Sequence, residues 1–359
     1  MATARRLTGL WDWSRAELES RTARRALAAF RFPDAARAAG AAVAAADRSQ
    51  HRRSLIASLV LASEIQLAAG DLSGADELVQ RAHHELGGPQ DQAGDARVRL
   101  SCQRQLGHVA TRRGDYPKAE VWLLEAVAGA RRLGRSSGLE IALGLNLLGM
   151  LYKFSGDFEA AAAAYDEALT RLAETGRKRH PLQATLLHNL AGLAFSRGEY
   201  EKAAGHTQDA IAMRTALHGA DHPAVVADIA GRASLRAQQG DLDGAVADFE
   251  FVIAAIERTF GTQHYEWAVN VNNLGVVEAR RGDVVKAERL LRAALTTKEA
   301  ACGPDHIDVA YTLINLADLL EREGRAAEAD DLLSRAAAIT DATVRASHPV
   351  AVAVAARRR

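Results

Sequence analysis

The chain repeats one residue pattern at a fixed spacing. A glycine followed by an acidic residue, as at Gly282 and Asp283, separates two stretches whose apolar residues recur every three or four positions. This spacing predicts two amphipathic helices joined by a tight turn. The break glycines recur every 42 residues, which predicts stacked repeats rather than one compact globule. The series consists of Gly114, Gly156, Gly198, Gly240, Gly282 and Gly324.

The repeats divide the chain into consecutive hairpins. Ser14 with Glu17 three residues later forms a capping-box pattern, which predicts that the first helix begins at this point. Strand signals are weak throughout, so we expect an all-α fold of about eight hairpins and a closing helix. The expected parts are an N-terminal segment over 1–14, two degenerate hairpins over 15–86, a linker over 87–94, six hairpins over 95–346, and a closing helix with a basic tail over 347–359.

Composition narrows the classes of partner. The 45 basic residues are balanced by 45 acidic residues, whereas binding to nucleic acid or to a membrane surface normally needs a basic excess. We therefore expect no nucleic-acid and no membrane partner. Cys102 and Cys302 lie far apart without a partner spacing, and no long apolar stretch indicates a signal peptide. These features predict a cytoplasmic protein.

Five histidines share the 42-residue period and precede the first helix of a hairpin, and three of them are followed by proline. Equivalent positions in stacked helices lie about 10 Å apart, whereas zinc ligands lie about 2 Å from the metal. We therefore interpret these histidines as turn and cap residues, and we expect no metal and no cofactor. They are His180, His222, His264, His306 and His348.

Small residues also keep the period. Alanine stands five residues after each break glycine, as at Ala119 and Ala287, and a small residue stands seven before it, as at Gly107 and Gly275. Small side chains at both points allow the two helices of a hairpin to cross closely. Because one hairpin cannot bury its apolar face alone, each repeat needs its neighbours.

The small residues, the glycine–acidic turn and the alanine at fixed offsets resemble the tetratricopeptide repeat, in the 42-residue form of kinesin light chains and many bacterial proteins. The resemblance covers about 100–350 strongly and 15–86 loosely. It implies a right-handed α-solenoid. It also implies that the first helices of the hairpins line a concave groove, which holds a protein or peptide ligand.

The resemblance further implies which residues face the groove. Amide side chains both donate and accept hydrogen bonds, which suits recognition of a peptide main chain, and basic side chains suit acidic groups. Alternatively, some of the asparagines only stabilise neighbouring helix backbones. The candidate peptide-binding residues are Arg104, Asn146, Lys153, His188, Asn189, Asn272, Asn273, Arg280 and Asn315.

Two places depart from the pattern. Arg232 replaces a leucine found at the same position of other repeats, and Arg236 and Glu278 occupy one position of successive repeats. We expect Arg236 and Glu278 to pair between stacked helices, since buried charges are normally paired; the alternative is a specialised pocket or a weak point. At the N-terminus, Trp11 and Trp13 are expected to cap the first hairpin, with docking in the groove as the alternative.

Signals of catalysis are weak. The sequence holds no phosphate-binding loop of the GxxxxGK[ST] type and no HExxH motif. Gly134 to Gly138 match GxSxG by letters, but a nucleophile elbow needs a preceding strand, and a helix is expected here. We therefore expect a non-catalytic binding scaffold. The alternatives are a regulator that changes its superhelical shape on binding a peptide and, as a third hypothesis, an enzyme with a pocket between repeats.

Overall fold

A computed structural model describes residues 2–29, 31–87, 96–134, 137–176, 180–220, 222–344 and 348–357, with side chains from Asp12 onward. These residues form helices, turns and bends but no strand. Most of the expected linker and the centre of the GxSxG match lie outside them. The helices are α1 (Ala2–Ala28), α2 (Phe32–Ser49), α3 (Arg52–Ala68), α4 (Leu72–Leu86), α5 (Ala96–Arg112), α6 (Tyr116–Arg132), α7 (Gly138–Ser155), α8 (Phe158–Ala173), α9 (Pro181–Ser196), α10 (Tyr200–His218), α11 (Pro223–Gln238), α12 (Leu242–Phe260), α13 (Tyr265–Arg281), α14 (Val284–Cys302), α15 (Ile307–Arg322), α16 (Ala326–Thr343) and α17 (Pro349–Arg357).

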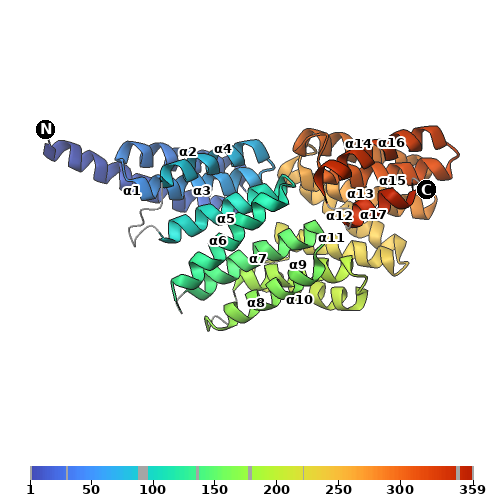
Figure 1. Ribbon diagram of the computed structural model, residues 1–359, viewed down its shortest axis with the longest axis horizontal. Coiled ribbons are helices and arrows are strands. Elements are labelled where there is room, and N and C mark those ends of the chain that lie inside the picture. Colours follow the sequence, from blue (N-terminus) through green and yellow to red (C-terminus); the bar gives the residue numbers. More distant parts are fainter. Residues whose placement is uncertain are drawn as a thin grey trace. The chain divides into compact units, whose positions relative to one another are not determined.

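The helices follow one another as hairpins, from α1 with α2 to α15 with α16, and α17 closes the series (Figure 1). This arrangement confirms the predicted all-α repeat solenoid. The chain divides into two compact units, residues 1–148 and residues 149–359, with the boundary inside α7. The candidate site described below lies in the second unit.

From the hairpin of α3 and α4 onward, the turn inside each hairpin is closed by a Schellman motif. At Gly114, which has a φ of 77°, the Gly114 N–H donates to the Thr111 carbonyl and the Asp115 N–H donates to the Ala110 carbonyl. This left-handed backbone favours glycine. Asp115 then caps the second helix by accepting from the Lys118 N–H. The repeated glycine–aspartate pair is therefore a helix stop followed by a helix start.

The periodic histidines cap the first helices, as predicted. The Nδ1 atom of His264 accepts a hydrogen bond from the Glu266 N–H at 3.2 Å. A neutral imidazole nitrogen thus satisfies one of the free N–H groups at the helix start. The same contact, two residues ahead, is made by His180, His222, His306 and His348.

Glycines at the helix crossings admit large side chains from the partner helix. A Cβ atom on Gly149 would lie 2.4 Å from Cε1 of Tyr165, which is fully buried. A Cβ atom on Gly107 would lie 2.5 Å from Cγ of Leu123, which is also fully buried. The predicted close crossings are therefore present, and they place large side chains over small residues.

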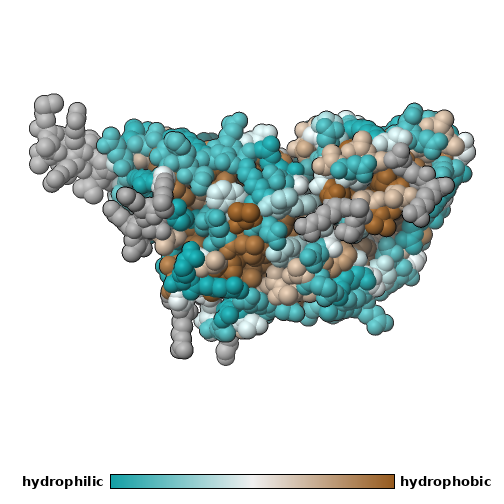
Figure 2. Space-filling view, viewed as in Figure 1, coloured by the Kyte–Doolittle hydropathy of each residue, from teal (hydrophilic) through white to brown (hydrophobic). Residues whose placement is uncertain are grey.

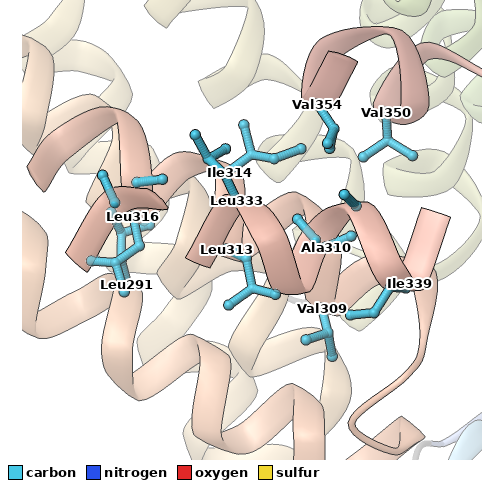
Figure 3. Packing of buried hydrophobic residues seen from close by; sticks show 14 of the residues in the cluster. Leu291, Val309, Ala310, Leu313, Ile314, Leu316, Leu333, Ile339, Val350 and Val354 are labelled. Carbon is cyan, nitrogen blue, oxygen red and sulfur yellow. The ribbon is translucent and has the colours of Figure 1, made fainter. Parts of the chain in front are cut away.

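The last helix packs onto the final hairpin. Val350 and Val354 of α17 join the hydrophobic cluster that includes Ala310 and Ile314 of α15 (Figure 3). Arg357 donates from Nε and Nη2 to the two carboxylate oxygens of Asp318, at 2.5 and 2.6 Å. The helix is thus held by burial along its length and by an ion pair at its end.

The first helix differs from its predicted start. The helix α1 runs without interruption from Ala2 to Ala28, so Ser14 lies inside it and does not begin it. A capping-box pattern is local, and it does not stop a helix that has already formed upstream. The side chain of Trp13 is exposed, with its ring centroid 6.3 Å from that of His51. The Trp11 side chain lies outside the described part.

The predicted pair between Arg236 and Glu278 is wrong. Arg236 donates from Nη1 to Asp248 at 2.9 Å, while Glu278 contacts Lys286 at 2.6 Å and Arg281 at 3.1 Å. Asp248 belongs to the same hairpin as Arg236, and Lys286 and Arg281 to the same hairpin as Glu278. Each charge is therefore neutralised inside its own hairpin, so no pairing between stacked hairpins is needed.

Arg232 shares the carboxylate of Asp248. Its Nε and Nη2 atoms donate to Oδ2 and Oδ1 of Asp248 at 2.9 and 2.8 Å. The Asp248 side chain is buried, at 8% exposure, and its carboxylate accepts hydrogen bonds from the guanidinium groups of both Arg232 and Arg236. The unusual arginine at this position is consequently part of a structural ion-pair cluster.

The face of the molecule shown in Figure 2 is mostly hydrophilic, with hydrophobic residues gathered in limited patches. Within the described ranges, every helix is too short or too polar to cross a membrane.

Candidate functional site

A pocket of about 190 Å³ opens among the helices of the second unit. Its volume exceeds that of a cavity of about 150 Å³ that holds benzene. The helices α7, α9 and α11, each the first helix of its hairpin, supply most of the wall. The lining residues are Lys153, His188, Asn189, Ala191, Gly192, Phe195, Ser196, Thr207, Asp228, Gly231, Ser234 and Leu235.

Asp228 is the charged residue most deeply buried in this wall, at 2% exposure. Its Oδ1 atom lies 2.7 Å from Nδ1 of His188 and 2.7 Å from Nη1 of Arg214. Because an ionised carboxylate only accepts hydrogen bonds, His188 donates from Nδ1. Arg214 also donates to the carbonyl of Ala224. These bonds fix the carboxylate in place from one side.

The other carboxylate oxygen of Asp228 is unused. Oδ2 is buried and has no hydrogen-bond partner among the described residues. A buried acceptor without a donor costs about 1–3 kcal/mol relative to a satisfied one. The pocket therefore contains a fixed acceptor with spare capacity.

Lys153 lies in the same wall and is half-buried. Its Nζ atom lies 5.6 Å from the centroid of the Phe154 ring, and it approaches Gly192, where a Cβ atom would be only 2.7 Å away. No carboxylate within the described ranges pairs with it. Burial lowers the pKa of Lys153, because no nearby anion compensates the loss of water.

Three predicted asparagines form a chain of amides between α13 and α15. Nδ2 of Asn315 donates to Oδ1 of Asn272 at 3.2 Å, and Nδ2 of Asn272 donates to Oδ1 of Asn273 at 3.2 Å. Asn272 is buried, while Asn273 and Asn315 are half-buried. These side-chain bonds include one between neighbouring repeats, and they leave further amide capacity on the half-buried pair.

The structure places the remaining candidates elsewhere. Arg104 on α5 is half-buried and Asn146 on α7 is buried, and both belong to the first unit. Burial lowers the pKa of Arg104, while the carboxylates of Glu64 and Glu140 oppose that shift. Arg280 is exposed near the end of α13. The structure thus brings together Lys153, His188 and Asn189 in one pocket, and Asn272, Asn273 and Asn315 in one amide chain.

Sequence reasoning missed the central residue of the pocket. Asp228 occupies the repeat position that holds Leu186, Asn270 and Thr312, all of them buried. A carboxylate at a buried repeat position needs a partner, so this substitution was a usable signal. The partner Arg214 is likewise a charged residue at a buried position. Among the described residues no group of three histidine, cysteine or acidic side chains could hold a metal ion.

Comparison with known structures shows the fold. A Rap conjugation gene regulator of plasmid pLS20, solved with the Phr* peptide, is 14% identical with a TM-score of 0.63, covering 82% of this chain and 76% of that one. A Rap protein complexed with Competence and Sporulation Factor is 16% identical with a TM-score of 0.62, covering 80% and 77%. BtubC (BKLC) from P. vanneervenii is 23% identical with a TM-score of 0.46, covering 70% and 92%.

Comparison with sequences gives the family. No curated protein matches the chain. The family model described as tetratricopeptide repeat matches residues 99–174, 140–216 and 267–342, which together make up more than half of the chain. The resemblance inferred from the glycine–aspartate turns and the small residues is confirmed. The chain belongs to the tetratricopeptide repeat family.

Proposed function

We propose that the chain is a non-catalytic scaffold that binds a protein or peptide through the first helices of its hairpins. The observation that carries this proposal is the pocket between α7, α9 and α11, where Lys153 and Asp228 retain unused hydrogen-bonding capacity. A folded protein rarely leaves such groups unsatisfied unless another molecule completes them. The pocket is open enough to admit a ligand side chain.

Two further observations support a peptide ligand. The half-buried amides Asn273 and Asn315 can donate to and accept from a peptide main chain without selecting its sequence. The Rap structures named above were solved with a factor or a peptide bound, so a fold of this kind is compatible with such a ligand. Because Cys102 and Cys302 lie far apart in the sequence without a partner spacing, we place this activity in the cytoplasm, a reducing compartment.

A displayed random-peptide library tests the proposal. Selection with the wild-type chain is compared with selection using the double variant Lys153→Met, Asn189→Ala. The matched control is Gln208→Ala, Arg289→Met, which removes one amide and one cation from exposed positions of α10 and α14. Circular dichroism first confirms that all three proteins keep the same helicity.

We expect enriched peptides that bind the wild type and the control equally and bind the pocket variant at least about tenfold more weakly, since one charge-assisted bond contributes about 1.5–3 kcal/mol. Peptides that bind all three proteins equally would place the binding surface outside the pocket. Failure to enrich any peptide would contradict the proposal itself.

A regulator that changes shape is a second candidate, and one contact favours it. His348, directly before α17, bonds to the carbonyl of Phe154, next to the pocket residue Lys153. A ligand that displaced this contact would release α17 from α7. Small-angle scattering before and after adding a selected peptide checks this: a changed radius of gyration supports regulation, and full binding without any change rejects it.

A further inference from the structure

Within the described part of the chain, the pocket contains a lysine ammonium group without an ion-pair partner and one carboxylate oxygen without a hydrogen-bond donor. Lys153 offers an ammonium group without a carboxylate among the described residues. Asp228 offers a buried Oδ2 atom without a donor. No ion pair joins Lys153 to Asp228 in the part of the chain that the structure describes. Each of the two groups is therefore available to a separate group of a ligand.

The charges decide what each group needs. Arg214, at 2.7 Å, already neutralises Asp228. A second cation at Oδ2 would lie close to the guanidinium group of Arg214, so a neutral N–H donor is favoured there. Lys153 has no counter-charge, so an anion is favoured at its Nζ atom. The pocket thus calls for one anionic group and one neutral N–H donor.

The rest of the wall fits a small apolar residue that carries these groups. Phe195 and Leu235 supply apolar surface beside the polar groups. Gly231 leaves open space, because a Cβ atom built on it would meet nothing within 4 Å. A ligand residue can therefore approach the α11 backbone without a clash.

We propose that this pocket binds a ligand residue that presents a carboxylate to Lys153 and an amide N–H to Oδ2 of Asp228. The carboxyl-terminal residue of a peptide carries both groups, and so does an aspartate or glutamate within a peptide. This inference rests on the proposed function and specifies the chemistry of the ligand at one site.

Four small probes separate the two groups and their two sources. N-acetylleucine carries the amide N–H and an α-carboxylate. N-acetylleucinamide lacks the charge, and 4-methylpentanoate lacks the N–H. N-acetylaspartic acid α-amide carries its carboxylate only on the side chain. Binding is followed by nuclear magnetic resonance on protein labelled at the lysine side chains, with the Lys153 signal assigned as the one that Lys153→Met removes.

We expect N-acetylleucine to shift the Lys153 signal with a dissociation constant on the order of millimolar, as its small size allows. N-acetylleucinamide and 4-methylpentanoate are expected to bind about tenfold more weakly, since each lacks one of the two bonds. N-acetylaspartic acid α-amide binding better than N-acetylleucine identifies an internal acidic residue as the source, and the reverse order identifies a carboxyl terminus.

Substitution provides a second test. Asp228→Asn presents an NH₂ group or a neutral oxygen in place of the carboxylate and is expected to weaken N-acetylleucine binding about tenfold. The matched control is Asp248→Asn in the next helix, α12, whose carboxylate is already held by Arg232 and Arg236. We expect this control to leave binding unchanged. If Asp228→Asn does not fold, the comparison of probes on the wild-type chain still shows whether the pocket recognises a carboxylate and an N–H group.

Three outcomes overturn the inference. Equal binding of N-acetylleucine and N-acetylleucinamide shows that no anion is recognised, and equal binding of N-acetylleucine and 4-methylpentanoate shows that no N–H is recognised. Absence of any shift at about 50 mM probe, well above the expected constant, also rejects it. Library peptides that depend on Lys153 and Asn189 would in those cases preserve the proposed function, so the two failures are distinguishable.

Discussion

The Nε2 atom of His348 lies 2.6 Å from the carbonyl oxygen of Phe154, although 194 residues separate them in sequence. The same imidazole accepts from the Val350 N–H through Nδ1 and so caps α17. Pro349 lies beside the turn at Gly156. One histidine therefore begins the last helix and fastens it to the end of α7.

Replacing His348 with alanine removes both bonds. We expect the second unit to lose about 1–3 kcal/mol of stability, from one helix cap and one buried hydrogen bond. Amide hydrogen exchange in α17 should accelerate. Val352→Ala, at an exposed position of the same helix, serves as the control and should leave exchange unchanged. Unaltered exchange in the histidine variant would mean that the cluster around Ile314 and the ion pair of Arg357 hold α17 without it.

His108 on α5 should make stability depend on pH. Burial lowers its pKa from 6.5 to about 4, and Arg112 adds to the shift. The folded state therefore keeps this side chain neutral, while the unfolded chain takes up a proton as the pH falls below about 6.5. Stability is lost between about pH 6.5 and pH 4, by no more than about 3 kcal/mol.

Chemical denaturation at a series of pH values measures this effect. The variant His108→Gln should show a flatter dependence than the wild type across that interval. The variant His84→Gln, at an exposed position of α4, should retain the wild-type slope. Identical slopes of stability against pH for all three proteins would show that His108 takes up its proton at the same pH in the folded and the unfolded state.

Asp248 should matter more for stability than Arg232, one of the two arginines that it holds. Asp248→Ala leaves Arg232 and Arg236 without their carboxylate, and we expect a loss of about 2–3 kcal/mol. Arg232→Leu should change stability by less than about 1 kcal/mol, because Arg236 still neutralises Asp248 and because Leu274 fills this position one repeat later. Urea unfolding measures the loss of stability in each variant. A larger loss in Arg232→Leu than in Asp248→Ala would contradict this prediction.

Two glycines offer a matched test of the crossing geometry. Gly149→Ala places a methyl group against the buried ring of Tyr165, and we expect a loss of about 1–3 kcal/mol from overpacking. Gly205→Ala lies within α10, where a Cβ atom would meet nothing within 4 Å. It should stabilise the chain by about 0.5–1 kcal/mol through higher helix propensity. Thermal unfolding measures both, and equal effects would contradict the crossing geometry.

Much of the fold could be predicted from the sequence because its determinants are local and periodic. Gly114 and Asp115 stop one helix and start the next through bonds that span a few residues, and His264 caps α13 through its own second neighbour. Both the glycine–aspartate turn and the histidine cap repeat with the 42-residue period, so a helix boundary that is ambiguous in one repeat can be placed from the equivalent residues of the others. The start of α1 was missed because the N-terminal region has no periodic copy.

The site was less predictable from the sequence. The period predicts the position of each residue on its helix, but it does not predict which partner the end of a long side chain contacts. The period placed Lys153, His188 and Asn189 on first helices, and the structure brings these three to one pocket. It could not show that Arg236 reaches Asp248 in its own hairpin rather than Glu278 in the next. The bond between His348 and Phe154 joins residues that lie 194 positions apart in the sequence, and no local pattern predicts such a contact.

The bond between His348 and Phe154 also changes how the second unit should unfold. A linear array of repeats frays from its ends, because each repeat is held only by its neighbours. Here the terminal helix is tied to α7, so the order of events becomes that of a closed loop: a long-range contact must break before the end can fray. Such contacts slow folding, because the chain loses the entropy of closing the loop before the contact contributes any stabilising energy. Tension applied to the C-terminus would thus reach the bond of His348 only after the ion pair of Arg357 and the packing of α17 had been broken.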